Sequence, residues 1–314
     1  MELDKLSTFE NLRVGPLTDW SLTRISGADR QTYLQGQLTA DIQGLPHGAQ
    51  TLSGHCDPKG KLWSILRLIN AGEWIWMLQP TSAETVQLPE LKKYSVFSKV
   101  NIEPEAQFCV VAVIGKQAKG FIEQHFGAAI AAQGGLLENG YCLSYVGQPM
   151  RYLLIISTEQ AQQLSINEGS LNKLWQGLDI AAGLPSLSER TSQEFIPQAL
   201  NLHLLNAISF TKGCYTGQEI VARAKYRGTN KRATMRFVGQ SSQEIENGCD
   251  LEMSLNGNWR RCGTVINSYR QDDGYTEVLA VVRKDSEADQ SYRLEGQPQS
   301  HLTLAHLPYS LDES

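Results

Sequence analysis

The chain has 314 residues, of which 41% are hydrophobic and 19% charged, a composition typical of a globular protein that can bury a sizeable core. Its length predicts two domains or three small ones. The formal net charge of −5 excludes a generally basic nucleic-acid-binding protein, so any contact with nucleic acid would have to come from a local patch.

The sequence gives no indication of export or of a membrane span. Segment 1–10, MELDKLSTFE, carries acidic residues and lacks the apolar run of a secretory signal. The apolar stretches 108–115 and 152–157 are too short to cross a membrane and are predicted to be strands. The six cysteines show neither a CxxC pair nor zinc-like spacing to histidine, so we expect no disulfide framework and no metal site. Together these features predict a cytoplasmic protein.

The first predicted elements are a strand, a helix and a hairpin. Alternation predicts a strand over 20–25, and helical spacing predicts a helix over 28–38 with Ser26 as its N-cap. The sequence Asp-Pro-Lys-Gly at 57–60 has the chemistry of a tight turn, because proline sets φ and glycine closes the turn. The segments on either side should therefore form a hairpin, and a further strand over 73–80 follows it.

The middle of the chain continues to mix strands and helices. Apolar runs and periodic stretches predict, in order, helix 81–94, extended segment 95–104, strand 108–115, helix 117–127, strands 141–146 and 151–157, and helices 158–168 and 172–183. This order lacks a regular strand–helix–strand alternation. It therefore favours an α+β fold with antiparallel sheets.

The pattern changes after Lys231. The preceding stretch is weakly patterned, whereas short strands then follow at nearly regular spacing, separated by Gly, Asn and Asp turns. That arrangement is typical of a small all-β barrel. We therefore predict a boundary between an α+β region, residues 1–230, and a C-terminal β-barrel, residues 231–314.

A glycine-flanked cysteine loop, KGCYTGQE at 212–219, is a candidate reactive site. Cys214 follows Lys212 by two residues and precedes residues that favour a helix. A nearby cation and a helix N-terminus both favour the thiolate, which is the reactive form of cysteine. Gly213 and Gly217 would allow a tight backbone and the close approach of a ligand. The alternative is a buried loop cysteine that packs well, and no histidine lies near in sequence to indicate a Cys-His hydrolase.

A local excess of positive charge follows this loop. Such a stripe could bind the phosphates of RNA or the glutamate tail of a ligand. Only Tyr226 supplies an aromatic ring for base stacking, which weakens the case for single-stranded nucleic acid, and a solvated linker is the alternative. Residues 221–236 contain six basic side chains and no acidic one: Arg223, Lys225, Arg227, Lys231, Arg232 and Arg236.

The segment ISFTKGCYTGQEIVARAKYRGTNKR resembles the signature of the YgfZ family, the folate-binding group of tRNA-modifying proteins related to the aminomethyltransferase of the glycine cleavage system. The segments TRISGADRQTYLQGQLTADI, HCDPKGKLWSILRL and WRRCGTV are also similar, so the resemblance runs from about residue 17 to the C-terminus. It implies an aminomethyltransferase-like ring of two interleaved α+β subdomains within 1–230, a small β-barrel in 231–314, and a central folate cavity.

The resemblance also implies site residues. The family's functional cysteine falls on Cys214, with Lys212 and Tyr215 beside it in the motif. Two tryptophans associated with the folate fall on Trp20 and Trp175, although a tryptophan is by default a core residue. The implied cofactor is folate, as tetrahydrofolate or a derivative, stacked on aromatic side chains with basic residues near its glutamate tail.

Departures from the transferase branch bear on activity. Where those enzymes carry an acidic pair, this chain has Trp63 and Ser64, and Ala181 and Ala182 stand in place of a second family element. A cavity without its carboxylate cannot readily perform a general acid/base step. Conventional aminomethyl transfer is therefore not expected.

The implied function is that of a folate-binding accessory protein that supports iron–sulfur cluster assembly or repair and thereby tRNA modification. Its expected partners are folate and iron–sulfur enzymes, including one that modifies tRNA, whereas direct tRNA binding is expected to be weak and no membrane is involved. Two alternatives stay open. One is a folate-dependent one-carbon transferase, which turnover of a one-carbon donor would reveal, and the other is a direct tRNA-binding protein that uses the basic stripe.

Overall fold

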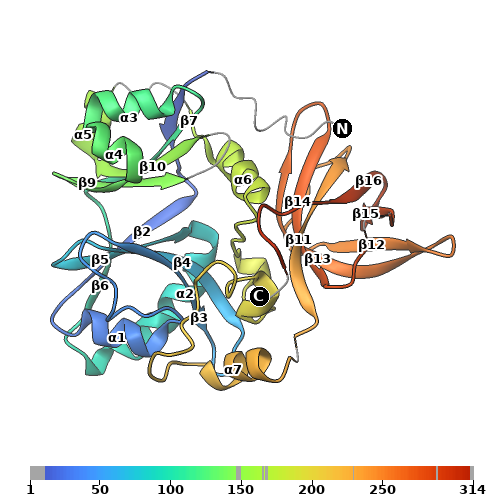
Figure 1. Cartoon of the computed structure of the whole chain (residues 1–314), viewed down its shortest axis with the longest axis horizontal. Coiled ribbons are helices and arrows are strands. Elements are labelled where there is room, and N and C mark those ends of the chain that lie inside the picture. The colour runs from blue at the N-terminus through green and yellow to red at the C-terminus, as the bar shows by residue number, and fades with distance from the viewer. Residues whose placement is uncertain are drawn as a thin grey trace.

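The computed structural model of the chain describes residues 11–145, 150–164, 166, 169–228, 230–287 and 289–311. Two α+β units and a closed β-barrel surround a shared apolar core, with helix α6 (Asn172–Ala181) between them (Figure 1). This arrangement confirms the predicted α+β class with a C-terminal barrel. The predicted helix 158–168 is shorter than expected and ends at Gln163. Segment 1–10 and residues 165, 167 and 168 lie outside the described residues.

The first unit contains a five-stranded antiparallel sheet in the order β3-β4-β5-β2-β6, called the lower sheet after its place in Figure 1. Helices α1 (Arg30–Gln37) and α2 (Thr81–Lys93) cover one face, and buried aliphatic side chains pack between them and the strands. The opposite face turns toward the shared core. The strands are β2 (Trp20–Ser26), β3 (Gln50–Cys56), β4 (Leu62–Asn70), β5 (Trp74–Pro80) and β6 (Asn101–Pro104).

The predicted turn between β3 and β4 is confirmed. The N–H of Gly60 donates to the carbonyl of Asp57 at 2.9 Å, and Gly60 has a φ of +71°, which glycine adopts without strain. The predicted extended segment 95–104 is only partly extended. Ser95–Phe97 forms a short 3-10 turn because the chain must reverse after α2 before it enters β6.

The prediction of Ser26 as a helix N-cap is wrong. Ser26 is the last residue of β2 and pairs with Trp74 on one side and Asn101 on the other. Its backbone therefore belongs to the sheet, and α1 begins later, with Asp29 at the N-cap position. Serine is a suitable capping residue by type, but the backbone of Ser26 is already paired with β5 and β6.

The second unit contains the upper sheet, in the order β1-β7-β10-β9-β8. Three helices pack on one face, α3 (Ala118–Phe126), α4 (Ala128–Gln133) and α5 (Thr158–Gln163), while the other face contributes to the shared core. The strands are β1 (Arg13–Pro16), β7 (Phe108–Ile114), β8 (Gly135–Leu137), β9 (Gly140–Tyr145) and β10 (Arg151–Ser157).

A largely irregular segment links α6 to the barrel and passes under the shared core. It contains two short 3-10 helices, η2 (Glu189–Thr191) and η3 (Pro197–Leu200), and ends in helix α7 (Gln218–Tyr226). Leu187, Leu200 and Leu202 of this segment are buried with side chains from both sheets and from the barrel. The side chains of this segment therefore fill the space between the two α+β units and the barrel.

The barrel closes in the order β11-β14-β13-β12-β15-β16 and has its own apolar interior. Its strands are β11 (Arg232–Gln240), β12 (Asp250–Leu255), β13 (Asn258–Arg270), β14 (Tyr275–Arg283), β15 (Tyr292–Leu294) and β16 (Gln297–Ala305). Within the described ranges, we find no helix with the length and apolar character needed to span a bilayer.

Asn201 joins the irregular segment to the barrel. Its buried side-chain amide donates to the carbonyl of Thr234 at 2.8 Å, and the N–H of Thr234 donates to Asn201 Oδ1 at 3.2 Å. We expect Asn201→Ala to lower the free energy of unfolding by about 2–3 kcal/mol in chemical denaturation, because both buried backbone groups would lose these bonds.

Asn206 provides a matched control. It shares the left-handed backbone of Asn201, with φ of 55° against 58°, but its side chain is exposed. Asn206→Ala should therefore lose only the backbone preference, about 1 kcal/mol. Equal losses in the two variants would contradict a stabilising role for the two buried hydrogen bonds.

Candidate functional site

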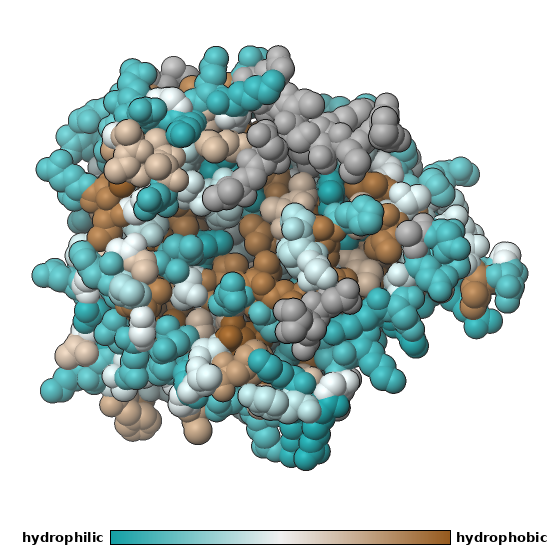
Figure 2. Space-filling view, viewed as in Figure 1, coloured by the Kyte–Doolittle hydropathy of each residue, from teal (hydrophilic) through white to brown (hydrophobic). Residues whose placement is uncertain are grey.

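Two connected cavities lie where the lower sheet, α6 and the barrel meet. The inner cavity is a narrow apolar slot, and the outer cavity beside it has a volume of about 360 Å³. Figure 2 shows hydrophobic side chains gathered near the centre of this face of the molecule. The two spaces are continuous, because four residues line both: Trp20, Pro80, Asp179 and Ser186.

The slot combines apolar walls with two charged groups. Arg67 comes from β4 and Asp179 from α6, and both line the slot. Flat apolar walls with a few convergent polar groups are typical of sites that bind planar organic ligands. The walls are formed by Leu52, Ile65 and Leu78 from the lower sheet and by Leu184, Pro185, Leu202 and Leu205 from the irregular segment.

A buried ion pair lies at the junction of the two cavities. Arg151 of β10 donates to Asp179 Oδ1 at 2.8 Å, and its guanidinium carbon is 4.5 Å from the ring centres of both Tyr145 and Trp175. Burial raises the pKa of Asp179, and the charges of Arg151 and Arg67 oppose that rise. The carboxyl is thus held in a dry setting where it can accept hydrogen bonds from a ligand.

Two asparagines fix the walls of the outer cavity. Asn172, at the start of α6, accepts from the N–H of Asp19 at 3.2 Å and donates to Thr18 Oγ1 at 2.8 Å. Asn267 of β13 accepts from the N–H of Ser186 at 2.9 Å and donates to the hydroxyl of the same residue at 2.8 Å. The pairing of β13 with β14 shifts register next to Asn267, and such an irregularity re-aims a side chain.

The two predicted folate tryptophans occupy different positions. Trp20 begins β2, is half-buried and lines both cavities. Trp175 is fully buried in α6, meets Tyr145 edge-on at 5.2 Å, and is absent from the lining of either cavity. Trp20 can therefore contact a ligand directly, whereas Trp175 lies behind the wall, against Arg151.

Cys214 lies on the outer surface, in a loop that crosses the end of the β3–β4 hairpin. Helix α7 begins four residues after it, as the sequence predicted. Gly217 has a φ of +83°, and a Cβ there would come within 2.6 Å of the carbonyl of Asp57, so this position requires glycine. Gly213 has open space around it and meets no such constraint. Cys214 lines neither cavity.

The other two motif residues face inward. The ammonium of Lys212 donates to the carbonyls of Gln35, Leu38 and Ala40 at 2.6, 2.7 and 2.8 Å. All three N–H donors are thereby used, so the lysine has none left to donate to the sulfur of Cys214. Burial lowers the pKa of Lys212 to about 8, and Asp41 opposes this shift.

Tyr215 is buried beneath the loop, and the Lys212 ammonium lies 5.0 Å from the centre of its ring. Burial raises the pKa of the Tyr215 hydroxyl, and the nearby Cys56 adds to the rise. Lys212 and Tyr215 therefore anchor the loop to α1 and to the lower sheet. Their positions leave Cys214 as the exposed member of the motif.

The six cysteines differ sharply in exposure. All are free, and Cys214 alone is exposed. Burial raises the pKa of Cys142 to about 12, of Cys249 to about 11 and of Cys262 to about 12, which keeps these thiols neutral. Neutral, buried thiols are poor nucleophiles. Across the described part of the chain, no group of three or more metal-binding side chains is present.

The basic stripe is divided by the fold. Arg236 is buried in the barrel and paired with Glu277 at 2.7 Å, so it does not belong to a surface patch. Lys225 of α7 lies 3.9 Å from the ring centre of Phe210. Five basic residues remain exposed along α7 and the start of β11: Arg223, Lys225, Arg227, Lys231 and Arg232.

Three charged residues at the site, Arg67, Arg151 and Asp179, were not predicted from the sequence. Each is a charged residue within a mostly apolar stretch, LWSILRLIN in β4, RYLLIIS in β10 and NKLWQGLDIA in α6. Because a buried charge requires a partner or a function, such residues are a usable signal. What the sequence could not give is that the three come together from separate elements.

Comparison with known proteins places this geometry in context. Residues 230–297 match the family described as "YgfZ, beta-barrel domain". The chain is 46% identical over 304 residues to "tRNA-modifying protein YgfZ" from Yersinia pestis (strain Pestoides F), covering 95% of this chain and 92% of that protein. The protein of the same name from Yersinia enterocolitica is also 46% identical over 304 residues.

A solved structure shares the fold. The "glycine cleavage system aminomethyltransferase T" from Bartonella henselae superposes with a TM-score of 0.72 and covers 96% of this chain and 87% of its own. The two sequences are 18% identical, so the likeness bears on the fold alone. It confirms the predicted aminomethyltransferase-like architecture.

Proposed function

The chain belongs to the YgfZ family, and we propose that it binds a reduced folate in the two central cavities and supports iron–sulfur enzymes, among them one that modifies tRNA. The observation that carries folate binding is the apolar slot, which has Trp20 on its wall and Arg67 and Asp179 as its charged groups. The six free thiols fit a reducing compartment, so we place the protein in the cytoplasm.

The slot and the outer cavity together fit the chemistry of a pterin. A pterin ring is flat, so it can stack on Trp20 where the slot, of about 30 Å³, opens into the outer cavity of about 360 Å³. Its amino and ring N–H groups are donors that suit the carboxylate of Asp179, and its carbonyl oxygen is an acceptor that suits Arg67. A site that satisfies such donors rejects flat apolar rings, because its own polar groups would stay unpaired.

We assign the two tryptophans different roles in this proposal. Trp20 stacks on the ligand, and Trp175 holds Arg151, which in turn fixes the Asp179 carboxylate. Replacing Trp20 by Ala should weaken tetrahydrofolate binding about tenfold, since stacking of one heteroaromatic ring contributes roughly 1–3 kcal/mol. Isothermal calorimetry with tetrahydrofolate measures this loss.

The matched control for this prediction is Trp259→Ala. Trp259 lies in the barrel hairpin under the guanidinium of Arg293 and is remote from both cavities. Its removal should leave tetrahydrofolate affinity unchanged. An unchanged affinity in Trp20→Ala would remove this residue from the binding site.

Support of iron–sulfur enzymes is assigned to the surface of the Cys214 loop. The thiol is exposed, whereas Lys212 and Tyr215 hold the loop rigidly on the lower sheet. A rigidly presented exposed thiol can meet a partner protein, because no rearrangement is needed to reach it. In this proposal, folate binds in the cavities and the partner protein binds at the Cys214 loop.

Cys214→Ser should keep the fold and lose the function. Serine replaces an exposed thiol, so we expect a change of about 0.5 kcal/mol or less in the free energy of unfolding. Activity of iron–sulfur tRNA-modifying enzymes in a deletion strain should nevertheless fall when this variant is the only copy. Cys109→Ser, at a half-buried thiol, is the matched control and should complement fully. Full complementation by Cys214→Ser would refute a functional thiol.

Conventional aminomethyl transfer is not part of the proposal. By the resemblance, Trp63 and Ser64 occupy the place of the acidic pair of the transferase branch, and the carboxylates that line the cavities are Asp19 and Asp179 instead. Asp179 is already paired with Arg151, which occupies one of its carboxylate oxygens. One-carbon transfer would need a different arrangement of acids from that of the transferase branch.

Direct tRNA binding is a second candidate, favoured by the exposed basic residues of α7. Five cations in a chain with a net charge of −5 form only a small positive patch, and Arg223 is already paired with Glu219. We expect tRNA affinity to be weaker than micromolar at physiological salt, with a shallow dependence on salt. Filter binding across a salt series tests this, and a steep slope with nanomolar affinity would favour the RNA-binding alternative.

A further inference from the structure

A groove continues from the outer cavity toward solvent along α6. It runs between this helix and the barrel, and it shares Gln176 and Asn247 with the outer cavity. Its charged residues are Lys173 of α6, Arg270 of β13 and Glu244 in the loop after β11. The slot, the outer cavity and this groove therefore form one continuous path.

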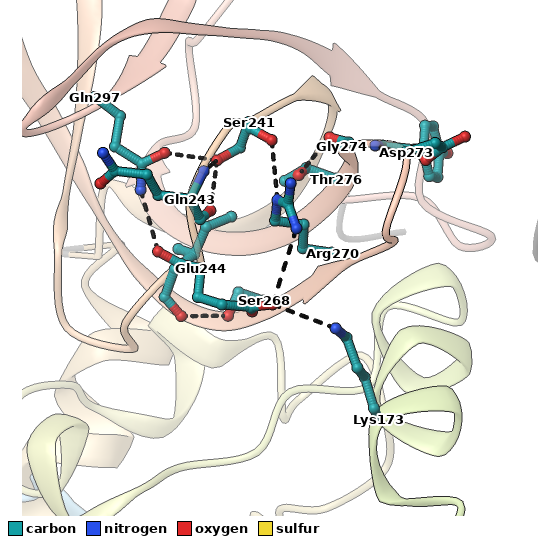
Figure 3. A network of polar contacts seen from close by, with 12 residues as sticks. Lys173, Ser241, Gln243, Glu244, Ser268, Arg270, Asp273, Gly274, Thr276 and Gln297 are labelled. Atoms are coloured by element: carbon teal, nitrogen blue, oxygen red, sulfur yellow. Dashed lines mark hydrogen bonds and ion pairs between the residues drawn. The ribbon is translucent and has the colours of Figure 1, made fainter.

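The two cations of the groove share one carboxylate oxygen. Lys173 Nζ is 3.3 Å from Glu244 Oε1, and Arg270 Nη1 is 4.0 Å from the same atom (Figure 3). The Arg270 side chain is mostly buried and is fixed by donation from its Nε to the carbonyl of Ser241 at 2.9 Å. Two positive charges against one negative charge leave the groove with a net charge of +1.

The ion pairs that hold the Glu244 side chain in place are weak. Its side chain is 72% exposed, and Lys173 is 54% exposed. Exposed ion pairs contribute little to stability, since water and salt screen them. An incoming carboxylate can therefore take the place of Glu244 on both cations, while Glu244 turns into solvent at small cost.

Helix α6 sets the spacing of the path. Asp179 faces the slot, Gln176 lines the outer cavity and the groove, and Lys173 lies at the outer end. These positions are three residues apart, so each step advances about 4.5 Å along the helix axis. One face of α6 thus presents the Asp179 carboxylate to the slot, the Gln176 amide to the outer cavity and the Lys173 ammonium to the outer end of the groove. In that order, these groups suit the ring, the linker and the glutamate tail of a folate.

We infer that the groove of Lys173 and Arg270 binds the chain of γ-linked glutamates of a polyglutamylated folate. The inference rests on the proposed function, because the ring in the slot brings the tail to the groove. Once the ring is bound, the tail carboxylates act at high effective concentration, so even weak exposed contacts add affinity. Glu244 occupies the same cations in the absence of a tail and competes with it.

The test compares tetrahydrofolate with its pentaglutamate form by isothermal calorimetry. The native protein should bind the pentaglutamate about fivefold more tightly than the monoglutamate, and this advantage should shrink as salt rises. Lys173→Met keeps the aliphatic stem and removes the charge. It should reduce the advantage to about twofold or less and leave monoglutamate affinity unchanged.

Glu244→Gln should act in the opposite direction. Removing the competing carboxylate should raise pentaglutamate affinity and leave monoglutamate affinity unchanged. Lys231→Met, an exposed charge change on the α7 side, should leave both affinities unchanged. Misfolding could only weaken binding. A gain of affinity in Glu244→Gln therefore separates a binding effect from a stability effect.

The outcomes distinguish this inference from the function on which it rests. If the monoglutamate binds and the longer tail gives no advantage, or Lys173→Met retains the full advantage, the tail site is wrong and folate binding stands. If Glu244→Gln lowers pentaglutamate affinity, the competition is wrong. If neither form binds, folate binding itself fails and the tail site fails with it.

Discussion

The ion pair between Arg151 and Asp179 is the interaction on which the central site depends. It joins the upper sheet to α6, and its guanidinium lies against two aromatic rings, those of Tyr145 and Trp175. Removing one partner of a buried pair leaves an uncompensated charge, which typically costs about 3–5 kcal/mol. The position of α6 fixes which residues face the slot, the outer cavity and the groove. A contact between the upper sheet and α6 thus determines the geometry of a path that runs past the lower sheet and the barrel.

The separation of the cavities from the Cys214 loop gives the molecule two distinct faces. The path along α6 is lined by side chains that suit a small, flat, anionic ligand. The loop lies across the β3–β4 hairpin, with its lysine bound to three carbonyls next to α1. Both contact the lower sheet, and both include residues of the irregular segment, which lines the slot with Leu202 and Leu205 before it reaches Cys214. A signal between ligand and thiol therefore has two routes, the strands of that sheet and the segment itself.

Local chemistry was enough to predict much of the fold. The β3–β4 turn, helix 81–94 and the barrel strands each follow from residue type and spacing over a few positions. The Ser26 cap failed because neighbouring strands determine the backbone there, and strand pairing is not visible in a local window. The site was harder for the same reason. Trp20 and Trp175 look alike in sequence, and only the packing around α6 exposes one and buries the other.

The order of the strands has a consequence for how the chain folds during synthesis. The lower sheet is built from consecutive elements between Trp20 and Pro104, so it can form as soon as that stretch has emerged from the ribosome. Strand β1 precedes it in sequence but pairs only with β7, about a hundred residues later. The N-terminal strand must therefore stay unpaired while a complete sheet forms behind it. It then closes the edge of a sheet whose other strands are the last of the α+β region to be made.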